Sequence, residues 1–290
     1  KAWCKALENE SDTDNKAFLV AQIQMVGNDS AVPCLEKLLL VEKLSDPVAR
    51  ALASIHTPQA GRLLTDALDQ AQGTSQISIV EALGIMQFSA AADKITRLAS
   101  SGDARLRKVS FFALGSFGLP GSGSLLYDAA IKSGFIYEPT QATASYLLWL
   151  NNLIRNDNKT LAEKKCIGLI KACTTNAQVP TRAEALSLLV RSSGPKAASY
   201  LYTALKSPDK TYRMAALNQA PNLKGQEYTL GWIKQAGKLT GQPKAEVIDM
   251  LGEREDPAAL PFIRQALSDQ AEAVRLSAIR ASARVGKNSV

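Results

Sequence analysis

The chain has 290 residues, of which 46% are hydrophobic and only 6% aromatic, and its formal net charge is +7. Alanine and leucine dominate the apolar set, which disfavours a β-sandwich, because strands are richer in β-branched and aromatic residues. No run of about 18 apolar residues occurs, so the sequence excludes a membrane-spanning helix.

The first residues, 1–5, lack the charged segment and apolar run of a secretory signal. We therefore expect a soluble protein, either cytoplasmic or exported with a signal removed. A short helix over residues 2–7 matches the second helix of the repeat described below. It indicates either a truncated upstream repeat within a longer multidomain chain or a capping first helix.

One helical pattern recurs with a period near 31 residues. Apolar residues stand four and seven positions after each anchor, on one face of a helix. A mostly small residue stands eight positions after, and it lets a neighbouring helix approach closely. We call this predicted element the anchor helix. Its anchors are Lys16, Ser45, Gln76, Arg107, Arg182, Arg213, Lys244 and Arg275.

A second helix, here the companion helix, is predicted about 18 residues after each anchor. A cluster of Gly, Pro, Asn or Ser separates the two helices, as in 118–121 and 192–195. Asp103, Asp209 and Asp269 precede anchor helices in the N-cap role. The companion segments are 34–39, 63–68, 94–99, 125–130, 200–205, 231–236 and 262–267.

The spacing of 75 residues between Arg107 and Arg182 predicts an irregular, longer repeat at about 132–175. We expect its anchor near Gln141, its anchor helix over 140–154 and its companion helix over 161–173. The whole chain, 1–290, is then a single all-α domain. It is an α-solenoid, or α-α superhelix, of about nine helix pairs.

The repeating unit begins its anchor helix with an Asp or Pro and a basic anchor, continues with an Ala-Leu-Gly segment and a turn, and adds an apolar companion helix. This unit resembles the HEAT repeat. The pattern is most similar to the short bacterial HEAT-like repeats also found in phycobilisome lyase subunits. Segments 103–118, 244–252 and 272–286 carry the resemblance. It implies an armadillo-like scaffold that binds a protein partner, with companion helices lining the concave side. Since Ser45 and Gln76 replace the basic anchor, any ladder of anchor–carboxylate contacts should be interrupted there.

Two exposed columns of the companion helices test the nucleic-acid interpretation of the positive charge. A phosphate-binding solenoid should present Lys or Arg in most rows. These columns instead alternate in sign, so nucleic acid is an unlikely partner, although a basic patch at Lys132, Lys164, Lys165 and Lys171 keeps that alternative open. The columns are Lys37, Asp66, Arg97, Asp128, Thr203, Lys234, Gln265 and Leu40, Asp69, Ser100, Ile131, Lys206, Gly237, Ser268.

Catalytic and cofactor chemistry finds little support in the sequence. The single histidine, His56, lies in a predicted turn, and the cysteines lack metal-ligand spacing. Segment 121–124 lacks the lysine and the preceding strand of a phosphate loop. Trp149 and Trp232 form no Trp–Asp–Arg set like that of HEAT-like DNA glycosylases. We therefore expect no enzyme activity, no cofactor and no metal.

The aromatic residues of the irregular repeat are the best candidates for partner binding, because interfaces favour Tyr and Trp. The alternative, which we favour, is that these rings fill extra core volume where the spacing changes. The candidates in the irregular repeat are Tyr137, Tyr146 and Trp149. Second-rank candidates are Tyr127 and Tyr202, on companion helices of the expected concave side, and Lys164 and Lys165 of the basic patch are further ones.

The four cysteines are too few for a disulfide-dense scaffold. Cys166 and Cys173 lie two helical turns apart, too far to bridge. Cys4 and Cys34 fall on neighbouring helices, where a bridge fits the geometry, but buried free thiols are expected.

Overall fold

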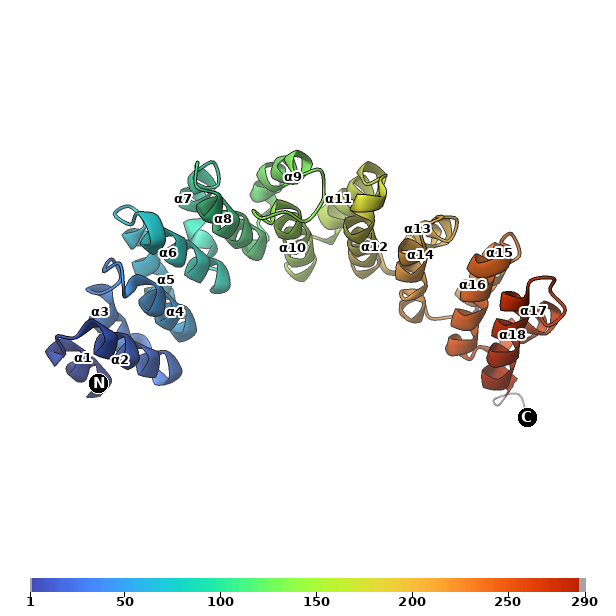
Figure 1. The fold of residues 1–290 in the computed structure, drawn as a ribbon, viewed down its shortest axis with the longest axis horizontal. Coiled ribbons are helices and arrows are strands. Elements are labelled where there is room, and N and C mark those ends of the chain that lie inside the picture. The colour runs from blue at the N-terminus through green and yellow to red at the C-terminus, as the bar shows by residue number, and fades with distance from the viewer. Residues whose placement is uncertain (1, 287–290) are drawn as a thin grey trace. The chain divides into compact units, whose positions relative to one another are not determined.

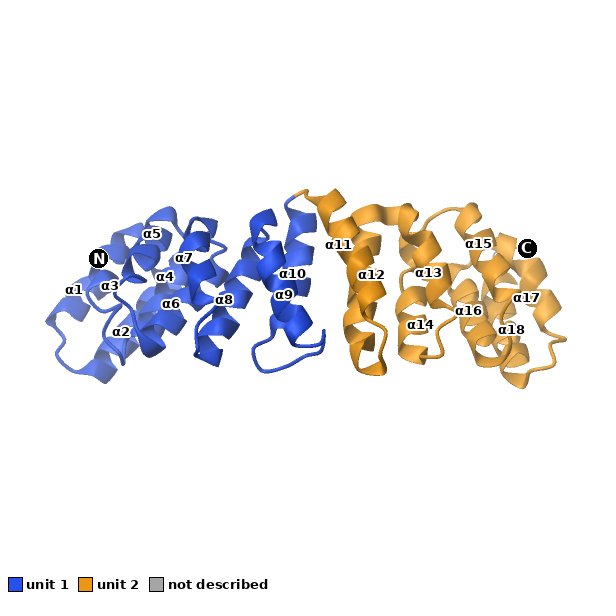
Figure 2. Ribbon diagram, turned by 90° about the horizontal axis from the view of Figure 1, so that it is seen from above, with its two compact units in different colours: residues 1–156 blue, residues 157–290 orange. Residues whose placement is uncertain are grey.

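The computed structural model describes residues 2–286, and all regular elements in that range are helices (Figure 1). The chain divides into two compact units, Lys1–Asn156 and Asp157–Val290, here unit 1 and unit 2 (Figure 2). Whether they behave as the single domain expected from the sequence stays a prediction.

Unit 1 contains five helix pairs, each formed by an odd-numbered helix and the even-numbered helix that follows it. The even helices also stack on one another in succession, from α2 to α10. The helices are α1 (Ala2–Asn9), α2 (Thr13–Val26), α3 (Val32–Glu36), α4 (Ser45–Ile55), α5 (Pro58–Ala67), α6 (Gly73–Ile85), α7 (Ala92–Leu98), α8 (Ala104–Phe117), α9 (Gly123–Lys132) and α10 (Ala142–Arg155).

Unit 2 repeats the arrangement with four pairs. Its helices are α11 (Lys159–Ala172), α12 (Val179–Ser193), α13 (Ala198–Ala204), α14 (Lys210–Leu217), α15 (Gln226–Ala236), α16 (Gly241–Arg254), α17 (Leu260–Ala266) and α18 (Glu272–Val285). The described residues of the two units thus hold nine pairs. The predicted α-solenoid is confirmed, and the pairing order is companion helix first, then anchor helix.

The even helices are the anchor helices, and they form the tighter layer of each unit. The small-residue column explains the close approach: a Cβ on Gly84 would lie 2.9 Å from the Cα of Ala113, and one on Gly252 would lie 2.8 Å from the Cα of Ala281. The odd helices contact one another far less. Since a curved stack is tightest on its inner side, the odd helices lie along the outer side of each unit's curve (Figure 1). The prediction that companion helices line the concave side was therefore wrong.

The apolar column four positions after the anchors forms the shared core, as predicted, except at its last member. Val80, Phe111 and Leu217 are buried, whereas Ile279 on α18 is 57% exposed. In α16 the equivalent Ile248 is covered by the next even helix, and no described helix covers that face of α18. The expectation that Ile279 is buried was wrong for this reason.

The cysteines depart in part from expectation. Cys4 and Cys34 form a disulfide between α1 and α3, although free thiols were expected. Both residues are half-buried, so the sequence pattern alone could not separate the alternatives. Cys166 and Cys173 are buried and free, as predicted. Burial raises the pKa of Cys166 to about 12 and that of Cys173 to about 11.

Candidate functional site

Two aromatic candidates of the irregular repeat, Tyr146 and Trp149, form a cluster with Tyr127 and Phe135 in the core of unit 1. Tyr127 lies 5.7 Å from Phe135 and 5.3 Å from Tyr146, ring centre to ring centre, and Tyr146 stacks on Trp149 at 5.4 Å. Trp149 donates its indole N–H to the carbonyl oxygen of Leu119 at 2.8 Å. Tyr146 and Trp149 are fully buried, so these rings have no surface to present to a partner.

The other candidates are not brought together into one site. Tyr202 is half-buried on α13, packs edge-on against Trp232 at 4.9 Å and donates its hydroxyl to the carbonyl of Tyr228. Tyr137 is 56% exposed in the loop before α10. Lys164 is exposed and Lys165 half-buried, both on α11. Their role in partner binding stays a prediction.

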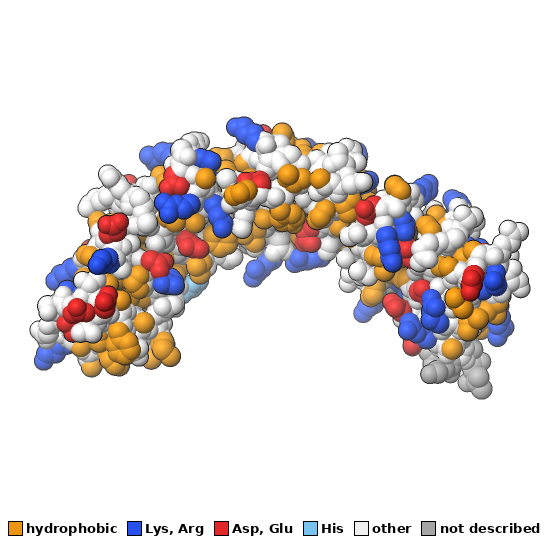
Figure 3. Space-filling model, in the orientation of Figure 1, with side chains coloured by type: hydrophobic (Ala, Val, Ile, Leu, Met, Phe, Trp, Pro, Cys, Tyr) orange, Lys and Arg blue, Asp and Glu red, His pale blue; other side chains and the backbone are white. Residues whose placement is uncertain are grey.

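The surface charges of the described residues are mixed in sign. Every residue of the two companion-helix columns is exposed, as predicted. Blue and red side chains are interspersed on the face shown in Figure 3. The proposed basic patch includes Lys132 of unit 1 and three lysines of unit 2, so it is not one surface within either unit. Whether nucleic acid is a partner stays a prediction.

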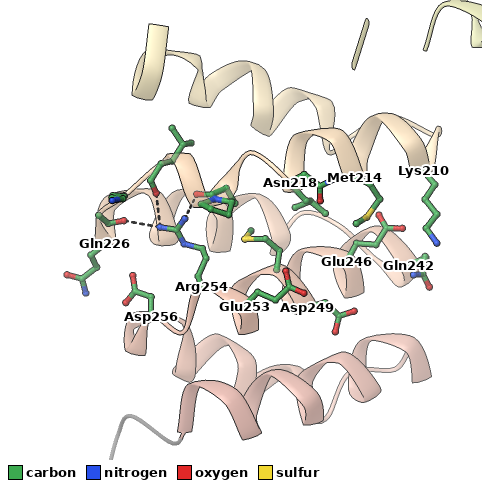
Figure 4. Close-up of a pocket in the computed structure, with 17 residues that line it drawn as sticks. Lys210, Met214, Asn218, Gln226, Gln242, Glu246, Asp249, Glu253, Arg254 and Asp256 are labelled. Atoms are coloured by element: carbon green, nitrogen blue, oxygen red, sulfur yellow. Dashed lines mark hydrogen bonds between the residues drawn. The ribbon is translucent and has the colours of Figure 1, made fainter. Parts of the chain in front are cut away.

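A hollow of about 800 Å³ opens in the even-helix layer of unit 2, between α14 and α16 (Figure 4). Its cause is local: α14 has 8 residues, whereas α16 and α18 have 14 each. Pro221 stands in the column where other anchor helices have a small residue, and the chain turns through a short 3₁₀ helix, Ala220–Asn222. Because proline cannot continue a helix in this position, the missing turns of α14 leave the space empty. We call it the unit 2 hollow.

The unit 2 hollow has an apolar floor and polar walls. Leu217, Leu223 and Met250 are buried beneath it. Figure 4 shows side chains of α14 and of α16 facing the space from opposite sides. The labelled residues are Lys210 and Met214 from α14 with Asn218 at its end, Gln242, Glu246, Asp249, Glu253 and Arg254 from α16, Gln226 at the start of α15 and Asp256 after α16.

The carboxylates on the α16 wall all have cationic or polar partners. Glu246 accepts from Nε and Nη2 of Arg213 at 2.8 and 2.9 Å, in a pair whose side chains are 5% and 7% exposed. Hydrogen bonding to Glu246 raises the pKa of Arg213. Asp249 pairs with Arg280, and Glu253 lies 3.5 Å from Arg284. Only the Arg213–Glu246 pair is buried and held in place, whereas the other two are exposed surface pairs.

Arg254 holds the irregular turn that shapes the hollow. Its guanidinium donates to the carbonyl oxygens of Ala220 at 2.6 Å and Leu223 at 2.9 Å. Its Nε donates to Thr229, whose hydroxyl donates to Asp256 at 2.6 Å. These bonds tie the turn between α14 and α15 to α16, and the carbonyl of Ala220 also accepts the backbone N–H of Leu223. Pro221 is the one sequence signal for this site, but a proline in a repeat column does not by itself predict a cavity.

Other chemistry is scarce in the part of the chain that the structure describes. His56 is exposed at the end of α4, in the predicted turn. No group of three metal-ligating side chains comes together within residues 2–286. None of the helices there is both long and apolar enough to cross a membrane.

The fold and its surfaces define an α-solenoid of helix pairs without an evident reaction centre in the described residues. The family of HEAT repeats matches residues 229–290, the segment of the last two pairs. This segment therefore carries HEAT-like repeats, and the remaining described helices follow the same pairing. None of the curated proteins matches it in sequence.

Two solved structures illustrate the range of similar folds. An engineered protein is 16% identical, with a TM-score of 0.45, over 98% of this chain and 88% of its own. Human deoxyhypusine hydroxylase, in complex with glycerol, is 15% identical, with a TM-score of 0.36, over 93% of this chain and 98% of its own.

Proposed function

We propose that this protein is a non-catalytic scaffold that binds a protein partner, and that the unit 2 hollow receives part of that partner. The observation that carries the proposal is a preformed hollow in an otherwise close-packed helix layer. Half-buried Met214 offers apolar contact, and charged side chains, most of them paired, line its polar walls. Binding sites for side chains combine such an apolar floor with a few placed polar groups.

An interaction role fits these walls better than catalysis. A general acid or base needs a proton to exchange, yet Glu246 and Asp249 are held by arginines. Met214 and Met250 line the space, and methionine adapts to varied partner side chains. The exposed Tyr137 and Lys164 remain candidate contacts elsewhere on the scaffold.

The test compares three baits in nuclease-treated native extract: the intact chain, Asn218→Trp and Gln265→Trp. Asn218 is exposed at the hollow, so an indole there fills it, whereas Gln265 is exposed on α17, in the outer layer. We expect a protein captured by the wild type and by Gln265→Trp, and lost with Asn218→Trp. Identical capture by all three baits would refute the role of the hollow.

The salt dependence of binding distinguishes the nucleic-acid alternative from the proposed scaffold function. Retention of the chain on immobilised DNA or RNA that falls steeply between low and physiological salt would support it and contradict the proposal. We expect no such salt-dependent retention.

A further inference from the structure

A second hollow, of about 970 Å³, lies within unit 1 between α7–α8 and α9 with the loop that follows it. Arg107, the anchor of α8, lines this unit 1 hollow together with Phe111, Lys132 and Glu138. The hollow opens where the repeat spacing changes. From Arg107 to the next anchor position, Gln141, the step is 34 residues, because the loop 133–141 is longer than its counterparts.

The anchor arginines share one mode of attachment. In Arg107, Arg213 and Arg275 the Nη1 atom donates to the carbonyl oxygens five and six residues earlier, at 2.7–2.9 Å. This contact fixes the guanidinium against its own turn. The contact does not use the other edge of the guanidinium, formed by Nε and Nη2. That edge has the geometry for bidentate binding of a carboxylate.

What meets that edge differs between repeats. At Arg213 it is the carboxylate of Glu246 from the following even helix, bound through both nitrogens. Arg182 instead lies over the ring of Tyr212, 4.2 Å from its centre. At Arg107 and at Arg275 neither Nε nor Nη2 has a hydrogen-bond partner within residues 2–286, and both side chains are half-buried; of the two, Arg107 lines the unit 1 hollow.

The carboxylates already in the unit 1 hollow do not complete this edge. Glu138 accepts bonds from the backbone N–H and the hydroxyl of Thr140 and from the N–H of Ala142. Burial alone would raise the pKa of Glu138, but these bonds and the nearby charge of Arg107 hold it below its usual value. The Asp128 side chain is exposed on α9, one helical turn before Lys132. It forms no ion pair with Arg107 among the described residues.

We propose that the unit 1 hollow binds a carboxylate carried by an acidic side chain of a protein partner. The Nε–Nη2 edge of Arg107 takes the carboxylate as Arg213 takes Glu246, and Lys132 adds positive charge at the exposed rim. Leu125 and Ala129, both half-buried on α9, supply apolar surface for the neighbouring partner side chains. This proposal depends on the proposed scaffold function only in taking the carboxylate from a protein partner. The unit 1 hollow shares no residue with the unit 2 hollow.

The test uses the whole chain labelled with ¹⁵N and follows the Nε–Hε signals of its arginines. The probes are the peptide acetyl-Ala-Leu-Glu-Leu-Ala-amide, its Gln counterpart and glutarate. We expect the Glu peptide to shift the Arg107 signal saturably and the Gln peptide to leave it unmoved. Arg107→Gln should weaken binding about tenfold or more, because a charge-assisted bidentate contact is lost.

Three variants keep the outcome interpretable. Arg275→Gln removes an anchor with the same carbonyl contacts and should leave peptide binding unchanged. Arg107→Lys keeps the positive charge but lacks the two parallel N–H donors of arginine. It should therefore bind the Glu peptide weakly, while its thermal unfolding matches that of the wild type. Asn218→Trp should bind the peptide normally, which separates this site from the unit 2 hollow.

Equal binding of the Glu and Gln peptides, or an Arg107 signal that none of the probes moves, would overturn the proposal. Saturation by glutarate without binding of the Glu peptide would overturn the protein partner as the source and keep only a site for small carboxylates.

Discussion

The buried Arg213–Glu246 pair allows the most direct test of how the repeats of unit 2 hold together. Both side chains are at most 7% exposed, and the two bonds are 2.8 and 2.9 Å long. Glu246→Ala leaves the arginine cation buried, with Nη1 still bound to its turn but Nε and Nη2 unpaired. Removing one partner of such a pair costs about 3–5 kcal/mol of unfolding free energy.

The measurement is urea unfolding, monitored by far-ultraviolet circular dichroism. The urea concentrations at the midpoint are compared between variants whose free energy of unfolding falls with urea at the same slope. Replacing both residues, as Arg213→Met with Glu246→Leu, removes the stranded charge and should recover most of the loss. Arg280→Ala breaks the exposed pair with Asp249 and should cost less than about 1 kcal/mol. A loss below about 1 kcal/mol for Glu246→Ala, or a double variant no better than the single one, would refute the reasoning.

Three further predictions concern packing and the cysteines. Gly252→Val should destabilise the protein by about 1–3 kcal/mol in the same urea assay, because even a Cβ would lie 2.8 Å from backbone of α18. Reducing the Cys4–Cys34 bond, which spans 30 residues, should cost about 3–4 kcal/mol, and a Cys4→Ser variant should become insensitive to reductant. Cys166 and Cys173 should resist iodoacetamide at pH 8 until urea unfolds the chain, as mass spectrometry would show. Since folding raises their pKa values, the stability they contribute below about pH 9 is lost as pH rises toward 11–12.

The helices and their caps were predictable because their causes are local. Asp103 and Asp209 accept backbone N–H bonds at the starts of α8 and α14, as expected. Asp269 instead accepts the N–H of Ala271 and caps the turn before α18. The same local chemistry placed the turn at residues 118–121 and the helices of the irregular region within two residues of their predicted ends.

The candidate residues were predicted less well, because a ring at helical spacing looks the same whether it fills a core or faces a partner. Tyr146 and Trp149 are buried by contacts with α9 and the turn that precedes it, which the sequence pattern does not specify. Arg107 was visible as an anchor, but its open edge depends on what the neighbouring repeat fails to supply.

The sequence by itself determined the helices, their period and the apolar face that stacking buries, since a 3.6-residue periodicity and Gly or Pro at turns act within a few residues. Only the tertiary structure decided which layer is tight and where it opens. Those features arise from the fit between helices about 30 residues apart: Gly columns draw the even helices together, and a short α14 or a long loop before α10 leaves a hollow.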